Sequence, residues 1–269
     1  MISSAITTRL VLCCLALVLV LTGCTTVSET GRRQFNVMSP GEEMQLGFSE
    51  FDKMKTQVPI SKDAAANELL QRVGKRIAAV AQLPDAAWEF VVFESKEANA
   101  FCLPGGKVGV YTGILPITKD EGGLATVIGH EVAHAVARHG GERVSHAMGI
   151  KVVGEILSAS TEKSKYAPLI QQTYGLGAEL GLALPHSRKQ ESEADYIGLL
   201  YMARAGYDPE AAVAFWERFG AFNRQAGGAA QPWFLRTHPL DATRVQQLKD
   251  WLPKARLEYR APGTPLTAK

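Results

Sequence analysis

The sequence predicts an α+β fold that is mainly helical, with a small β-sheet beside the helix that contains residues 124–136. From residue 39 onward, apolar residues recur mostly every three or four positions, which is the spacing of amphipathic helices. Segments with strand character are short and fall between residues 88 and 111. Gly206 and Pro209 separate two of the helical segments, as residues that end and begin helices do.

The first 23 residues are typical of a secretory signal. Arg9 is their single charge, and an apolar run extends from Leu10 to Leu21. This run is shorter than the roughly 20 residues that a membrane-spanning helix needs, but it suits the core of a signal peptide. Leu21-Thr22-Gly23-Cys24 resembles a bacterial lipobox, which predicts cleavage before Cys24 and lipidation of its thiol. A plain signal peptide and an uncleaved anchor are the alternatives.

Lipidation of Cys24 would attach the protein to a membrane in the bacterial periplasm. Thr25 follows the cysteine where Asp would favour another destination, so we expect the inner face of the outer membrane. Cys13 and Cys14 leave with the signal, so no internal disulfide is expected in the mature chain. The remaining Cys102 is expected to act as a small buried residue.

The balance of charge argues against a nucleic-acid partner. The chain has 29 Lys and Arg residues against 27 Asp and Glu residues. It shows neither the basic patch of nucleic-acid-binding proteins nor a polybasic run for membrane attachment.

The mature chain is long enough for one domain with its own core. We expect residues 24–38 to form a polar tether, residues 39–260 the domain and residues 261–269 a tail. The sequence Ser39-Pro40-Gly41-Glu42 predicts a helix start, because it combines a capping residue, a proline at the first position and an acid three residues after the cap. Residues 62–82 predict the next helix.

A strand and a hairpin are predicted before the central helix. Trp88–Phe93 has the pattern of a strand, and Phe101 and Val108–Tyr111 flank Pro104-Gly105-Gly106 as the two arms of a hairpin. Further helices are expected at Val144–Ser158, residues 187–205, residues 209–225 and Leu240–Trp251. The glycine-rich residues 174–184 fit either a buried helix or a mobile lid over a cleft.

The residues most informative about function are His130-Glu131-Val132-Ala133-His134. On a helix, the two histidines lie about 40° apart on one face, so both imidazoles can reach one metal ion. Glu131 then lies where a zinc-bound water would be. Zinc lowers the pKa of that water, and a carboxylate can take its proton to form the attacking hydroxide. The pattern predicts metal-assisted hydrolysis of a peptide bond.

A catalytic zinc ion needs a third protein ligand and an open position for water. Glu191 and Asp195 are four residues apart on a predicted helix and share one face. This spacing lets Glu191 bind zinc, while Asp195 accepts a hydrogen bond from the far nitrogen of a zinc-bound histidine.

Three nearby residues are expected to play smaller parts. If the helix continues, His139 lies about 140° around it from His134 and faces away as a polar or capping residue. Glu193 is expected to face solvent or to pair with a neighbouring basic residue. His186, five residues before Glu191, either lies near the metal or is an ordinary exposed histidine.

Glu-Ser-Glu-Ala-Asp at residues 191–195, after His-Glu-Val-Ala-His, resembles the M48 family of zinc metalloendopeptidases. Further elements resemble the family in the same order, and together they extend over about residues 30–252. These are Thr30-Gly31-Arg32-Arg33, the segment Asn99–Gly113, and Thr237-His238-Pro239 followed by Arg244. Within the family, the chain is most similar to single-domain bacterial periplasmic lipoproteins, and less similar to a mitochondrial inner-membrane protease.

The resemblance implies a zincin-type fold and a set of roles. Zn²⁺, one ion per chain, would be bound by His130, His134 and Glu191, with Glu131 as general base and then acid. His238 would stabilise the oxyanion, and it could also occupy the fourth zinc position and hold the enzyme idle.

Two further roles follow from the resemblance. Arg244 would pair with Asp195 or with the oxyanion. Family members bind substrate as an added strand at a sheet edge, so that edge is expected at Gly106, Lys107, Val108, Gly109, Val110 and Tyr111. An ordinary hairpin is the alternative for these residues.

These expectations define a zinc-dependent endopeptidase that hydrolyses misfolded or misassembled bacterial envelope proteins, with contacts to the outer-membrane assembly machinery as a further expectation. The alternative is an outer-membrane protein assembly factor or chaperone with a structural zinc site. The presence of Glu131 argues against this alternative, because a structural site needs no base and normally closes all four zinc positions.

Overall fold

The computed structural model describes residues 23–159, 186–225, 233–238 and 242–261. These residues form two compact units: residues 23–42 with 140–159, and residues 43–139 with the described residues from 186 onward. The alternatives for residues 174–184, and most of the predicted signal and tail, lie outside the described residues. None of the helices in the described part of the chain combines the length and the hydropathy of a membrane span.

The first unit contains a hairpin within the segment that was predicted to be a tether. Strands β1 (Cys24–Thr26) and β2 (Arg33–Phe35) pair antiparallel, with Cys24 opposite Phe35. Arg32 donates to both carboxylate oxygens of Glu142 in helix α6 (His139–Ala159), at 2.8 and 3.0 Å. Strands of three residues are too short to show an alternating pattern, and the ion pair is far apart in sequence, so the sequence did not indicate this hairpin.

The second unit is built on a three-stranded sheet of β3 (Glu89–Phe93), β4 (Ala100–Leu103) and β5 (Lys107–Tyr111). The order is β3-β5-β4, with β5 parallel to β3 and antiparallel to β4. The predicted strand and hairpin are therefore confirmed. Gly105 and Gly106 form the turn at φ +83° and +81°, values that side chains disfavour.

The prediction of a substrate edge at Gly106–Tyr111 is wrong, because β5 is the central strand and pairs on both sides. A hairpin motif indicates only the pairing of its own two arms. The parallel pairing of β5 with β3 is not visible in it.

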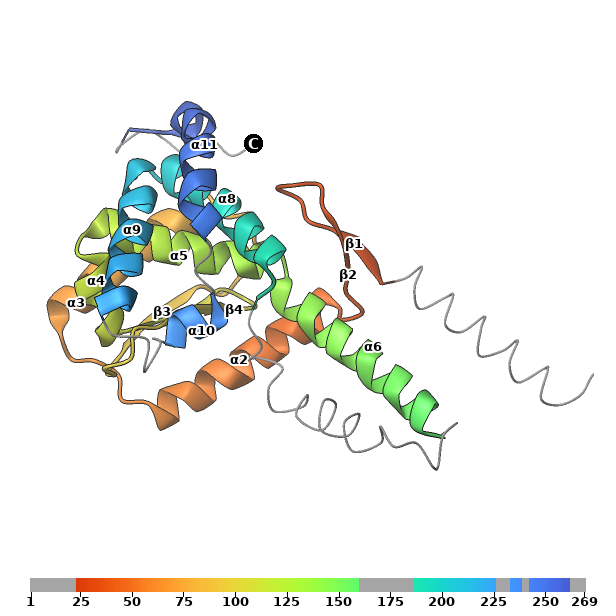
Figure 1. The fold of residues 1–269 in the computed structure, drawn as a ribbon. Helices are drawn as coiled ribbons and strands as arrows, with labels where there is room; N and C mark the ends of the chain where they lie inside the picture. The colour runs from red at the N-terminus through yellow and green to blue at the C-terminus, as the bar shows by residue number, and fades with distance from the viewer. Residues whose placement is uncertain (1–22, 160–185, 226–232, 239–241, 262–269) are drawn as a thin grey trace, which may run out of the picture. The chain divides into compact units, whose positions relative to one another are not determined.

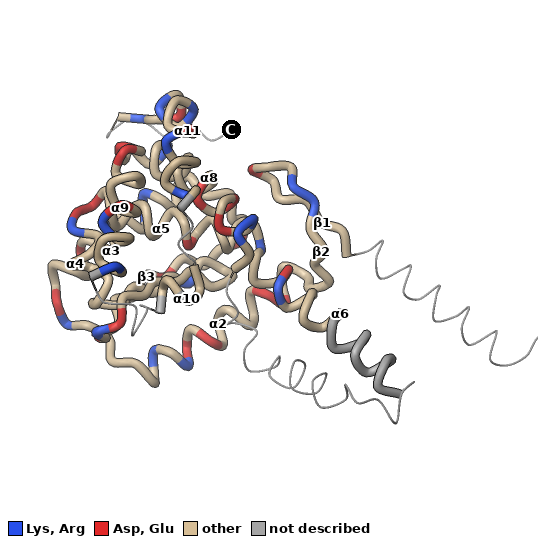
Figure 2. Tube along the Cα trace, in the orientation of Figure 1, with Lys and Arg blue, Asp and Glu red and all other residues tan. Residues whose placement is uncertain are grey.

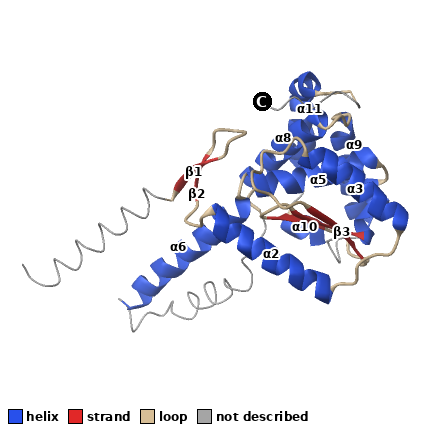
Figure 3. Cartoon of the chain, turned by 180° about the vertical axis from the view of Figure 1, so that it is seen from behind, coloured by secondary structure: helices blue, strands red, loops and turns tan. Residues whose placement is uncertain are grey.

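Helices cover both faces of this sheet (Figure 1 and Figure 3). Helix α2 (Pro40–Gln57) begins at the predicted cap, where Ser39 and Glu42 exchange hydrogen bonds, and Phe51 packs with Phe93 on one face. On the other face lies α3 (Ala64–Ala78), where Gly74 fits against the ring of Phe90. A short connection then leads to the central helix through η1 (Thr112–Ile114) and α4 (Leu115–Thr118).

The central helix α5 (Glu121–Val136) is almost wholly buried and packs against α3, β4 and α8 (Arg188–Arg204). The remaining helices are α9 (Glu210–Gln225), α10 (Trp233–Thr237) and α11 (Ala242–Glu258). Helix α11 packs on α8 and α9. The mainly helical α+β class is confirmed, with the small sheet beside α5 as in zincins.

Two glycines set the distance between α5 and α8. A Cβ atom on Gly129 would lie 2.9 Å from the carbonyl oxygen of Gly198, and one on Gly198 would lie 2.8 Å from the backbone nitrogen of His130. The helix backbones are therefore in direct contact, and the residues one and two turns before Gly198 face His130.

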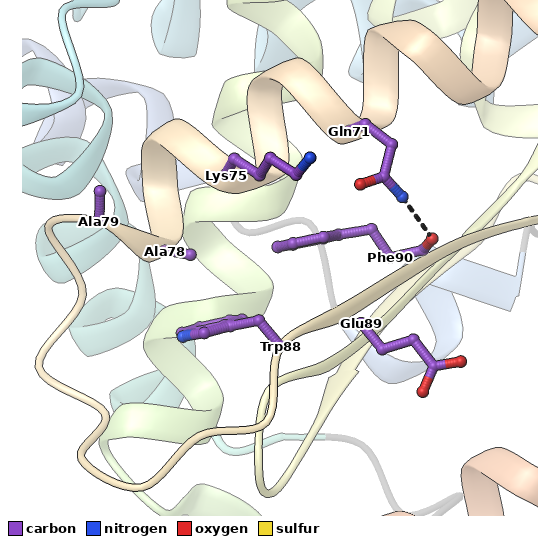
Figure 4. Close-up of a pocket in the computed structure, with 7 residues that line it drawn as sticks. All are labelled: Gln71, Lys75, Ala78, Ala79, Trp88, Glu89 and Phe90. Carbon is purple, nitrogen blue, oxygen red and sulfur yellow. Dashed lines mark hydrogen bonds between the residues drawn. The ribbon is translucent and has the colours of Figure 1, made fainter.

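Charged residues of both signs are interleaved along the described chain (Figure 2), as the near-neutral composition predicts. A surface pocket of about 450 Å³ lies between α3 and β3, with Trp88 and Phe90 along its wall and the Gln71 amide donating to the Phe90 carbonyl at 3.0 Å (Figure 4). No histidine lines this pocket.

Candidate metal centre

Helix α5 brings its two motif histidines together. Asp120 caps the helix by accepting a hydrogen bond from the Gly123 amide at 2.8 Å, and regular helix follows to Val136. His130 and His134 therefore lie one turn apart, as their spacing predicts, and both are buried. Their Nε2 atoms are 3.0 Å apart.

Helix α8 adds a carboxylate at the same point. Its first turn is fixed by a reciprocal capping box between Ser187 and Gln190, which places Glu191 toward α5. One Glu191 oxygen lies 3.4 Å from His130 Nε2, and the other lies 3.3 Å from His134 Nε2. His238, directly after α10, completes the cluster, with its Nδ1 atom 2.9 Å from Glu191 and 3.2 Å from His130 Nε2.

These four side chains fit a metal ion. Each offers one ligand atom, and all four atoms lie within 4.8 Å of one another. Ligands at about 2.0–2.1 Å from a tetrahedral zinc ion are about 3.3 Å apart, close to the separations between the nitrogens and Glu191 oxygens of this cluster. His238 stands where a fourth ligand would stand.

A buried ion pair supports the cluster from behind. Arg244 donates to both oxygens of Asp195 at 2.7 Å, and it approaches Glu191 within 2.8 Å. Asp195 in turn lies 2.9 Å from His130 Nδ1, the nitrogen that faces away from the cluster. The guanidinium stacks 3.8 Å from the ring of Trp216. The predicted pairing of Arg244 with Asp195 is present, whereas no motif in the sequence indicated Trp216.

Burial and charge oppose each other in this cluster. Burial alone would raise the pKa of Glu191, but the charges of His238 and Arg244 outweigh it and hold that pKa well below its usual value. Burial likewise opposes charge on His130, yet Glu191 and Asp195 raise its pKa to about 9. Burial and the charge of His186 together hold the pKa of His134 well below its ordinary value.

Glu131, the predicted base, is also buried beside the cluster. Its carboxylate lies 3.4 Å from His238 Nε2. Burial, and after it the charge of Glu131, raise the pKa of the Cys102 thiol on β4 above its usual value, which disfavours the thiolate. Cys24 is exposed at the start of β1, and its lipidation remains a prediction.

The predictions for His139 and Glu193 are wrong. His139 is fully buried, with its Nδ1 atom 2.8 Å from His134 Nδ1 and its Nε2 atom 2.9 Å from Glu193. The prediction assumed that the helix continues past His134, but α5 ends at Val136 and Arg138 has a φ of +55°. This change of direction returns His139 toward His134. His186 also lies at the cluster, with its ring centroid 3.8 Å from that of His134.

Two histidines and a glutamate on one buried helix, with a second glutamate from a neighbouring helix, define the class of helical metallopeptidases. The chain belongs to peptidase family M48, a family of metalloendopeptidases, because residues 64–252 match that family. The family predicted from the sequence motifs is confirmed.

Named relatives support this assignment. The chain is 38% identical to the mitochondrial metalloendopeptidase OMA1 of Schizosaccharomyces pombe, over 85% of this chain and 66% of the relative. It is 32% identical to the human protein of that name, over 84% and 44%. It is 25% identical to the β-barrel assembly-enhancing protease of Escherichia coli, over 84% and 47%. The chain thus spans from under half to about two thirds of the length of these relatives.

The comparisons contradict the predicted location in a bacterial periplasm. The relatives that are 30–39% identical to this chain over the aligned residues are named as mitochondrial proteins of fungi, a plant and animals. The lipobox resemblance rests on four residues, whereas these similarities extend over most of the chain.

Proposed function

We propose that this chain is a zinc-dependent endopeptidase that cleaves extended segments of unfolded or misassembled polypeptides. The observation that carries the proposal is the convergence of His130 Nε2, His134 Nε2 and the Glu191 carboxylate, with Glu131 on the same helix. Two imidazoles and one carboxylate form a ligand set that suits zinc well.

The chemistry divides between the metal and the side chains. A bound zinc ion would lower the pKa of a water molecule and polarise the scissile carbonyl. Glu131 would take the proton from that water and deliver it to the leaving amine, acting as general base and then as general acid. Asp195, held by Arg244, keeps His130 in the orientation that presents Nε2 to the cluster.

Strand β4 is the substrate edge that the fold favours. Its outer side pairs with no strand among the described residues, and the strand packs against α5. An extended peptide added to this edge would be held by main-chain hydrogen bonds with little demand on its sequence, so unfolded polypeptides are the expected substrates.

His238 would compete with water for a zinc ion bound at this cluster. Its Nδ1 atom lies as close to His130 Nε2 and Glu191 as those ligands lie to each other. A water molecule would need this same position. We infer that His238 would occupy the fourth position at rest and would have to leave it before substrate binds.

The test is casein degradation by the purified protein, with and without a zinc chelator, beside Glu131→Gln. We expect the wild type to be active, and we expect chelation to abolish that activity. General acid–base catalysis contributes about 10²–10⁴ in rate, so Glu131→Gln should lose at least about a hundredfold while it still binds one zinc ion. Equal cleavage by Glu131→Gln and wild type would exclude this mechanism, whereas no cleavage by zinc-loaded wild type or by His238→Ala would favour a chaperone with a structural zinc site.

A further inference from the structure

The two histidine ligands of the cluster are supported by different partners at their far nitrogens. His130 Nδ1 lies 2.9 Å from the Asp195 carboxylate. His134 Nδ1 lies 2.8 Å from the Nδ1 atom of another imidazole, His139, whose Nε2 atom lies 2.9 Å from Glu193. All five side chains are buried. One ligand therefore meets a carboxylate directly, and the other meets one through an intervening histidine.

Metal binding would fix the positions of the protons in the hydrogen-bonded series His134–His139–Glu193. A ligand nitrogen must present a lone pair, so the neutral His134 that binds through Nε2 has its proton on Nδ1. That N–H can donate only if His139 Nδ1 is an acceptor, which places the His139 proton on Nε2. The Nε2–H then points to Glu193, a carboxylate that accepts it. Each group has the one protonation state that satisfies its neighbour.

We propose that His139 and Glu193 are positioning residues that hold His134 in the tautomer and orientation required for metal binding. This inference rests on the proposed function, because it takes His134 as a ligand. Partners of this kind contribute roughly 10–100-fold to metal affinity in zinc proteins. The pair meets the cluster at His134 Nδ1, so its effect on the metal is expected to pass through this ligand.

The backbone conformation at Arg138 sets the position of His139. Arg138 lies in the left-handed region at φ +55°, a conformation that costs a non-glycine residue about 1 kcal/mol or more. Its guanidinium donates to Glu43 of α2 at 2.8 Å, and both side chains are largely buried. This contact holds the turn that separates His139 from α5.

A second metal ion is the competing interpretation, since ligand atoms of His134, His139 and His186 also lie within 4.8 Å of one another. The contacts favour the positioning role. The His134–His139 distance of 2.8 Å is that of a hydrogen bond, and the other His139 nitrogen already meets Glu193. The ring of His186 packs against the face of His134, at an interplanar angle of 37°.

The experiment measures zinc affinity by competition with a chromophoric chelator, on full-length His139→Ala, Glu193→Ala and the double variant. We expect each single variant to bind zinc about 10–100-fold more weakly than wild type. Because the two residues belong to one series of hydrogen bonds, their effects should not add. The double variant should therefore bind zinc no more weakly than the single variant with the lower zinc affinity. His139→Asn, which keeps an acceptor toward His134, should recover part of the loss.

Controls separate a positioning role from a structural one. His146→Ala removes an exposed histidine seven residues further along and should leave zinc affinity unchanged. Thermal melting of each zinc-free variant reports on folding alone. If His139→Ala does not fold, Glu193→Gln is a milder change in the same series of hydrogen bonds, since the amide still accepts a hydrogen bond. The zinc affinity of this variant should fall at least about threefold.

Three results would overturn the inference. The first is zinc affinity within about twofold of wild type in folded Glu193→Ala and His139→Ala. The second is a lower melting temperature of the zinc-free variants with unchanged affinity. The third is a second bound zinc ion in wild type that His139→Ala loses. Failure of the proposed function has a different signature, because wild type itself would then bind no zinc at the cluster.

Discussion

Arg244 neutralises two buried carboxylates at once. Its guanidinium lies 2.7 Å from Asp195 and 2.8 Å from Glu191, and all three side chains are shielded from solvent. We expect Arg244→Met to destabilise the zinc-free protein by about 3–5 kcal/mol, because it leaves carboxylates buried without their cation. Urea unfolding measures this loss.

Arg218→Met is the matched control for that prediction. Arg218 is also partly buried, but it donates to the backbone carbonyls of Ile117 and Thr118 and to no carboxylate in these contacts. Its loss should cost about 1 kcal/mol. Equal destabilisation by the two variants would show that the buried carboxylates near Arg244 need no cation.

His238 should restrain the enzyme. If it occupies the position that water needs, His238→Ala should raise the rate of casein cleavage several-fold at saturating zinc, while its zinc affinity falls by the loss of one ligand. Rates and zinc affinities of both proteins measure the two effects. A fall in rate at full zinc occupancy would instead show that His238 acts only by stabilising the oxyanion.

Single residues were predictable from the sequence where a regular helix fixes their direction. His130 and His134, and likewise Glu191 and Asp195, share faces because their spacing is that of a helix, and the structure brings both pairs together. His139 and Glu193 were misplaced because one residue, Arg138, leaves the helical conformation. The sequence does not show that change of φ, although Gly140-Gly141 marks the region as a helix end.

At the scale of elements, the contact between α5 and α8 depends on Gly129 and Gly198. A methyl group on Gly198 would lie 2.8 Å from backbone atoms of α5, so Gly198→Ala must push the helices apart. We expect a loss of about 1–3 kcal/mol in unfolding free energy, the usual cost of overpacking. Zinc affinity should fall as well, because α8 carries Glu191.

Gly149→Ala provides the comparison, because a Cβ atom at this helical position has no neighbour within 4 Å. It should stabilise the protein by about 0.5–1 kcal/mol through helix propensity. Chemical unfolding and chelator competition on both variants measure the effects. A neutral Gly198→Ala would mean that the two helices can separate without consequence for the site.

Individual helices and strands were easier to predict than the pairing between strands. The start of α2 followed from the cap signal at Ser39, because such a signal is local in sequence. The predicted start of a helix at Val144 and the predicted end of the last helix at Trp251 were wrong, because α6 begins at His139 and α11 continues to Glu258. The position of β5 between β3 and β4 depends on a parallel pairing across a connecting segment, and nothing in the β5 sequence encodes it. The substrate edge was assigned to the wrong arm of the hairpin for this reason.

At the scale of the whole molecule, we expect the stability of the fold to depend on the metal, because the cluster places charged groups in the interior. His130, His134, Glu191 and His238 place their ligand atoms within 4.8 Å of one another in the interior. A ligand that binds only the folded state stabilises it by about 2.7 kcal/mol at a free concentration one hundred times its Kd. We therefore expect zinc to raise the melting temperature by several degrees and a chelator to reverse the shift.

Two variants test whether zinc stabilises the protein by binding at this cluster. Glu131→Gln should show the full shift, because Glu131 is not a ligand in the proposed site, whereas His130→Ala should lose most of it. A shift in His130→Ala as large as that of wild type would place the stabilising zinc elsewhere on the chain. Because Glu131→Gln separates binding from hydrolysis, a full shift with no casein cleavage in that variant would show that the same cluster both stabilises the fold and performs the chemistry.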